Sequence, residues 1–139
     1  MSIQQTLTTS FKQQMIQAGQ NLATDTLRMA LYVAAADVGP NTTVYATDNE
    51  VVGTGYTAGG QQLTGVTIST STNGVVYVSF DNVVWSAASF TARGALIYNT
   101  TRGNASVAVL DFGSDKTCNN TFTVTMPANT ATTALIRFS

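Results

Sequence analysis

Histidine is absent from the 139-residue sequence, and cysteine occurs once, as Cys118. Without histidine the chain cannot supply a histidine general base, a Ser-His or Cys-His dyad, or a histidine metal ligand. A lone cysteine cannot close a disulfide within the chain, and Cys118 stands beside two asparagines in a predicted polar loop, with no base to activate a thiolate. These absences remove most hydrolase and metalloenzyme designs, so we expect neither enzymatic activity nor a cofactor.

Charge is also scarce. Charged residues make up 9% of the chain, against about 25% in a typical soluble domain. The 6 basic and 7 acidic residues are scattered singly, so no basic stripe is available to neutralise phosphates, and we expect no nucleic-acid partner. A surface with so few charges suits a protein that lies packed against other proteins.

Long apolar runs are missing as well. No stretch approaches the roughly 20 residues of a membrane-spanning helix, so we expect no membrane association. The first residues lack the basic-then-apolar plan of a signal peptide, which predicts that the protein is made and kept in the cytoplasm.

Three patterns resemble chemical motifs without their context. Two acid pairs, Asp48 with Glu50 and Asp111 with Asp115, are better explained as solvated turn acids or a weak cation site than as glycosidase carboxylates, which need a cleft between them. The glycine-rich segment 53–60 lacks the Lys-Ser/Thr of a phosphate-binding loop and is predicted to be a flexible loop with positive φ angles. Residues 111–113 spell Asp-Phe-Gly, which we interpret as a turn at the end of a strand.

The residues that are present predict an amphipathic helix over 2–18. Apolar residues recur at intervals of four, the pattern of one helical face. Ser2 and Gln5 form a capping-box pattern, and Gly19 stands where a left-handed C-terminal cap is expected. The apolar positions are Ile3, Leu7, Phe11 and Met15.

From residue 25 onward the hydrophobic period becomes two. Alternation over 27–33 predicts a half-buried strand. Asn73-Gly74 predicts a tight hairpin between strands at 63–70 and 75–80, and 101–104 a second hairpin between 90–98 and 106–112. Seven to nine short strands indicate an all-β, antiparallel sandwich or barrel over 25–139, with the whole chain, 1–139, forming one domain.

The aromatic residues allow two interpretations. Trp85, Phe80 and Phe90 either fill the core or form a sugar-stacking face, and the core is favoured because large rings dominate core burial. Tyr45 and Tyr56 lie in or near the glycine-rich region and are better candidates for an exposed contact.

Four stretches together resemble a group of small proteins encoded beside the capsid gene of tailed bacteriophages. They are 24–32 (TDTLRMALY), 51–60 (VVGTGYTAGG), 90–99 (FTARGALIYN) and 107–116 (VAVLDFGSDK). The resemblance covers nearly the whole chain in the same order and is closest to the capsid cement, or decoration, protein of short-tailed phages. It implies a jelly-roll-like β-sandwich on the capsid surface of the virion, bound to the major capsid protein as a homo-oligomer, with a dimer favoured over a trimer. A neck or tail component and a carbohydrate-binding module remain as alternatives.

Such a role implies interface residues. The helix stripe of Ile3, Leu7, Phe11 and Met15 either docks on the shell or a sister subunit, or folds back over its own sandwich. Arginine forks are favoured at interfaces, so some of the sparse arginines are expected to bridge to partner carboxylates. The expected interface set therefore adds Tyr45, Tyr56, Arg93 and Arg102 to the helix stripe.

Overall fold

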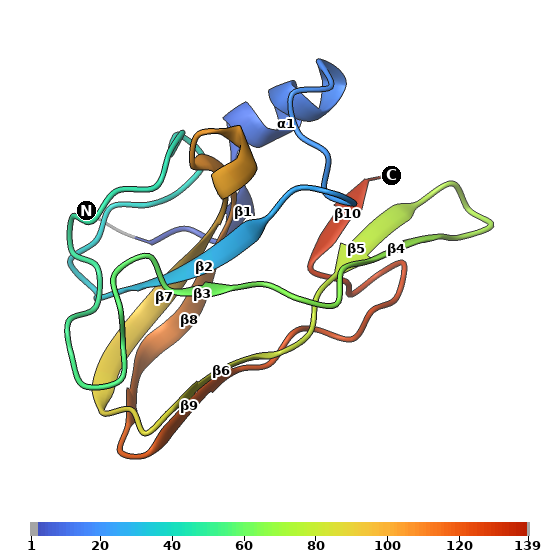
Figure 1. The fold of residues 1–139 in the computed structure, drawn as a ribbon. Helices are drawn as coiled ribbons and strands as arrows, with labels where there is room; N and C mark the ends of the chain where they lie inside the picture. The colour runs from blue at the N-terminus through green and yellow to red at the C-terminus, as the bar shows by residue number, and fades with distance from the viewer. Residues whose placement is uncertain (1–2, 139) are drawn as a thin grey trace.

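The computed structural model describes residues 3–138, which form antiparallel strands and one short helix (Figure 1). In chain order the elements are β1 (Thr6–Leu7), α1 (Thr9–Ile16), β2 (Leu27–Tyr32), β3 (Gln61–Gln62), β4 (Thr67–Thr70), β5 (Val76–Ser79), β6 (Val83–Ser86), β7 (Phe90–Asn99), the 3-10 turn Thr100–Arg102, β8 (Ala105–Cys118), β9 (Thr121–Val124) and β10 (Ile136–Phe138). The expected all-β class with one N-terminal helix is confirmed.

Two layers of strands face each other. The first is a five-stranded sheet in the order β1-β8-β7-β2-β3, and the second consists of the sheet β10-β5-β4 and the ribbon β6-β9. Every named strand pair is antiparallel, and the sheets do not close into a barrel. The main core lies between the layers, where Met29 and Ile97 of the first meet Trp85 and Ile136 of the second. This is the arrangement of a β-sandwich.

The five-stranded sheet is buried on its other face too. Tyr32, Leu96 and Tyr98 form a second cluster there, covered by Ile3 and Val38 from the N-terminal segment and the loop after β2. The prediction of a half-buried strand at 27–33 was therefore wrong, because Ala30 and Tyr32, on the face expected to be solvated, are also buried. The N-terminal segment and the loop after β2 therefore cover this face of the sheet, as a third layer of secondary structure would.

The helix is shorter than the predicted range 2–18. Ile3 bridges to Val38, and β1 pairs with β8, so the residues before Thr8 are extended. Thr8 is the observed N-cap, since its Oγ1 accepts a hydrogen bond of 3.2 Å from the backbone N–H of Phe11. The predicted cap Ser2 lies outside the described residues. The helical pattern failed here because the edge of β8 supplies tertiary hydrogen bonds that override local preference.

The C-terminal end of the helix also differs from the prediction. The left-handed residue is Ala18, with φ of 58°, and not Gly19. The N–H of Gly19 instead donates to the carbonyl of Gln14 over 2.7 Å. The chain therefore turns one residue earlier than the glycine suggested.

Both predicted hairpins are confirmed. Asn73-Gly74 joins β4 to β5, with φ of 82° at Gly74, and Gly103 and Asn104 turn β7 into β8 with φ of 65° and 63°. Each hairpin is fixed by residues that tolerate the left-handed region, which is why sequence alone could locate it.

The strand β8 is longer than expected. It continues from Ala105 to Cys118, so residues 111–113 do not end it, and the predicted turn there was wrong. The pairing between β7 and β8 instead shifts register near Gly113, whose φ is 81°. Cys118 was predicted to lie in a polar loop, but it ends this strand and is buried, with its thiol 3.4 Å from the carbonyl oxygen of Ala88.

The glycine-rich segment 53–60 is closely packed. Three of its glycines, at 55, 59 and 60, have positive φ as predicted. Gly60 lies against β2 so tightly that a Cβ atom there would stand 1.7 Å from the carbonyl oxygen of Met29. The end of the segment at Gly60 is therefore held against β2 by close backbone contact, while the predicted flexibility of the segment stays a prediction.

Candidate interaction surface

The predicted interface stripe of the N-terminal region faces mostly inward. Phe11 is 0% exposed and its ring lies 6.2 Å from that of Phe138, while Ile3 is 8% exposed and packs in the second cluster. Leu7 and Met15 pack against the main core and are half-buried. Of the two alternatives for this stripe, the structure therefore places it over its own sandwich.

Tyr45 and Tyr56 converge on a buried carboxylate. Both hydroxyls donate to Glu50, which is 7% exposed, and the N–H of Gly59 donates to the same carboxylate over 2.8 Å. The ring of Tyr45 stacks on that of Tyr98 with centroids 4.5 Å apart. Both side chains are partly exposed, and their hydroxyls bond within the loop 45–60, so a contact with a partner through these hydroxyls would have to break those bonds.

The electrostatics of this tyrosine cluster favour neutral phenols. Burial, followed by the hydrogen bond to Glu50, raises the pKa of Tyr45 and of Tyr56 far above the usual range of a tyrosine. Burial and the nearby charge of Glu50 raise the pKa of Tyr32 in the same way. The cluster therefore holds its protons: Tyr45 and Tyr56 donate to Glu50, and Tyr32 donates to the carbonyl of Ala46.

The structure does not leave Trp85 available for stacking on a sugar. Trp85 is 1% exposed, with Phe90 and Phe122 packed edge-on against it at 6.5 and 6.0 Å. Phe80 and Phe90 are buried as well. The core interpretation of these aromatics is confirmed.

Arg93 and Arg102 have carboxylate partners in their own chain. Arg93 lies 3.9 Å from Asp111 and 3.6 Å from Asp115, across the register shift of β8. Arg102 donates through Nε to Asp25 over 2.8 Å. Bridges to a partner protein would therefore have to compete with these contacts.

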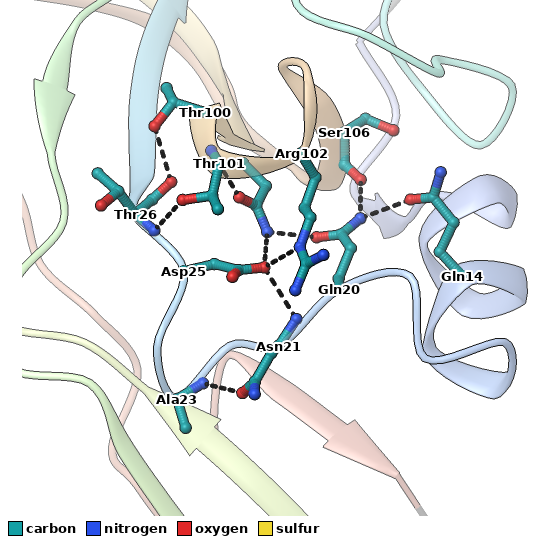
Figure 2. Close-up of polar contacts among 11 residues, drawn as sticks. Gln14, Gln20, Asn21, Ala23, Asp25, Thr26, Thr100, Thr101, Arg102 and Ser106 are labelled. Atoms are coloured by element: carbon teal, nitrogen blue, oxygen red, sulfur yellow. Dashed lines mark hydrogen bonds and ion pairs between the residues drawn. The ribbon is translucent and has the colours of Figure 1, made fainter.

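Asp25 is the centre of a polar network that joins α1 to the β7–β8 hairpin (Figure 2). Its side chain is 3% exposed, and its Oδ2 accepts from Arg102, from the N–H of Asn21 at 2.9 Å and from Asn99 at 2.8 Å. Asn99 also donates to Gln20, which bonds to Gln14 of the helix. Burial acts to raise the pKa of Asp25, but the bonds from Arg102, Asn21 and Asn99 outweigh it and hold the pKa below its ordinary value.

This network should make stability depend on pH. Because the folded pKa of Asp25 is below the unfolded one, its contribution is full above the unfolded value and is lost as pH falls through the folded value. The Asp25→Asn variant should therefore be less stable than the parent at pH 7, with the difference shrinking as pH falls from neutral to below the ordinary pKa of an aspartyl carboxyl, about 3.9. Urea unfolding across this range measures it. The control, Asp37→Asn at an exposed site, should follow the parent; a constant gap for Asp25→Asn would contradict the assignment.

An apolar groove opens between the end of α1 and the sheet β10-β5-β4. We call it the α1 groove; its volume is about 320 Å³, and Figure 1 shows α1 above this sheet. Ile68 and Val76, at its wall, are 48% and 38% exposed. The only charged residue lining it is Arg102, whose charge Asp25 balances. The larger apolar residues of the lining are Met15, Leu22, Ile68, Val76, Val78 and Phe138.

Sequence reasoning missed most of this surface. Met15 and Arg102 were the two expected interface residues that line the groove, while Ile68, Val76 and Phe138 come from strands distant from α1 in the chain. The available signal was composition: no charged residue occurs from position 61 to position 80. A stretch of that length without charged residues indicates a surface that another protein can cover without desolvating ions.

The described residues offer little for other chemistries. Within 3–138, no three His, Cys, Asp or Glu residues gather closely enough to hold a metal ion. None of the helices in this part of the chain has the length and apolar character needed to cross a membrane.

Comparison with known proteins gives no relative. No family model, curated protein or solved structure matches the chain.

Proposed function

We propose that this chain is a non-enzymatic virion protein that binds the outside of a bacteriophage capsid and cements neighbouring major capsid protein subunits. The α1 groove is the observation that carries the proposal. An apolar groove without an unbalanced charge can receive an uncharged segment of another protein without the cost of desolvating ions. The resemblance of 24–32, 51–60, 90–99 and 107–116 to phage cement proteins supplies the partner, and we infer the jelly-roll variant of the sandwich from it.

The scarcity of charge on the whole chain supports the same role. A cement protein needs no reaction chemistry, because many copies with modest interfaces add up to a large stabilisation of the shell. A neck or tail protein could use a similar surface, but at a dozen copies or fewer per virion instead of hundreds.

The test is co-sedimentation of the purified protein with shells that lack it, followed by the temperature at which the shells rupture. Saturable binding at hundreds of copies with a higher rupture temperature supports the cement role. Absence of binding to mature shells overturns it, and binding at a dozen copies or fewer would assign the protein to the neck or tail.

A variant of the groove tests which surface binds. Val76→Lys places a charge at the groove wall, where docking would have to desolvate it, so we expect at least a tenfold weaker affinity for shells, equivalent to about 1.4 kcal/mol. Val52→Lys is the matched control, since Val52 is 96% exposed and lies away from the groove. Equal shell binding by the two variants would show that the groove is not the docking site.

A further inference from the structure

The strand β4 is an open edge of the second layer. It lies last in the order β10-β5-β4, and among residues 3–138 no strand pairs with its outer side. Open edges in soluble proteins usually carry lysine, proline or another feature that blocks pairing with a second edge. β4 (Thr67–Thr70) has no such residue, and the entire stretch 61–80 has no charge.

The hydrogen-bond register of this edge is known from its partner strand. The N–H of Ser71 donates to the carbonyl of Val75 over 2.9 Å, and Ser69 lies opposite Tyr77. Because bonded and non-bonded pairs alternate along antiparallel strands, Ser69 turns its backbone groups toward β5. The backbone N–H and C=O of Ile68 and Thr70 therefore point outward.

These outward groups complement a second copy of themselves. In an antiparallel pair of β4 strands centred on Ser69, Ile68 of one copy faces Thr70 of the other, and each such pair can exchange two hydrogen bonds. The two Ser69 residues face each other as a non-bonded pair. No like charges meet, because neither β4 nor its flanks carry any.

We propose that two copies of this chain pair through their β4 edges about a two-fold axis at Ser69, forming one continuous six-stranded sheet. Such an axis stands perpendicular to the sheet, so both copies present the same face to the same side. Ile68, Val76 and Phe138, which line the α1 groove, lie on that face. The dimer therefore presents two α1 grooves on the same side, which would let one dimer bind two neighbouring capsid subunits at once.

The β4 contact specifies the surface through which the homodimer of the proposed function would form. Because dimer formation needs no capsid, an experiment can contradict the dimer without contradicting capsid binding, and the reverse. The first experiment is cysteine cross-linking under mild oxidation. The axis places the Cα atoms of the two Ser69 residues about 4.5 Å apart, within the range that a disulfide spans. Ser69→Cys should become a disulfide-linked dimer almost completely.

Thr67→Cys is the matched control. Thr67 is exposed and two residues from Ser69 on the same strand face, but its symmetry mate would lie four positions away, about 13 Å along the strands. It should cross-link no more than the parent, whose only thiol, Cys118, is buried. Equal cross-linking of the two cysteine variants would overturn the register and the proposal with it.

A second measurement does not depend on cysteine chemistry. Sedimentation equilibrium of the parent should give twice the monomer mass, and Ile68→Lys should shift it to the monomer, with at least a hundredfold weaker association. Val52→Lys, the same chemical change at a distant exposed position, should leave the dimer intact. Unchanged near-UV circular dichroism of Ile68→Lys establishes that it is folded. A parent that stays monomeric into the upper micromolar range, or a dimer unaffected by Ile68→Lys, overturns the proposal.

Discussion

Replacing Glu50 by alanine should lower the free energy of unfolding by about 3 to 5 kcal/mol, because three donors would lose their common acceptor. The donors are the hydroxyls of Tyr45 and Tyr56 and the N–H of Gly59. All lie where the loop 45–60 meets the sheet, so their bonds hold that loop in place. Urea unfolding at neutral pH, followed by the fluorescence of the single tryptophan, measures the loss.

Two controls separate this effect from a general sensitivity of the loop. Asp48→Ala, two residues earlier at an exposed position, should leave stability unchanged. Tyr45→Phe and Tyr56→Phe each remove one donor and should each cost about 1 to 2 kcal/mol. If Glu50→Ala were as harmless as Asp48→Ala, the carboxylate could not be the buried acceptor described above.

The second large effect is expected at Gly60. Gly60→Ala should lower the free energy of unfolding by about 4 kcal/mol, or prevent folding, because the added Cβ would stand 1.7 Å from the carbonyl oxygen of Met29. The positive φ of 76° adds about 1 to 2 kcal/mol of strain for any residue with a side chain. The thermal unfolding midpoint and urea titration both report it.

Gly74→Ala distinguishes the clash from the strain. Gly74 has nearly the same φ, 82°, but no atom lies within 4 Å of the point that a Cβ would occupy there. That variant should lose only about 1 to 2 kcal/mol. Similar losses at the two glycines would mean that the segment 53–60 is not pressed against β2.

The parts of the fold that could be predicted are those in which local residues decide the conformation. The hairpins at Asn73-Gly74 and 101–104 follow from residues that adopt positive φ easily, and their strands follow from alternation. The helix was placed correctly only over Thr9–Ile16. Its expected first turns became extended because the edge of β8 offered Thr6 and Leu7 better hydrogen bonds.

The candidate site could be predicted far less well. Tyr45 and Arg102 were expected to contact a partner protein, but both donate hydrogen bonds within the chain. Tyr45 donates to Glu50, and Arg102 donates to Asp25. Alternation could not reveal this, because a loop with little regular structure buries the second face of the five-stranded sheet. The α1 groove combines five separate segments of the chain, and only a three-dimensional structure brings Met15, Ile68 and Phe138 together.

The pairing of β2 has a consequence for how the chain reaches this structure. β2 binds β7 on one side, with Tyr32 opposite Gly94 and Leu27 opposite Asn99, so its partner is made more than sixty residues later. Contacts so remote in sequence must close a large loop before they gain any free energy, which slows folding. During synthesis the apolar strand β2 therefore emerges long before β7 exists. Its neighbours at that stage are the ribosome and other nascent chains, and successful maturation depends on keeping it apart from them until residue 99 has been added.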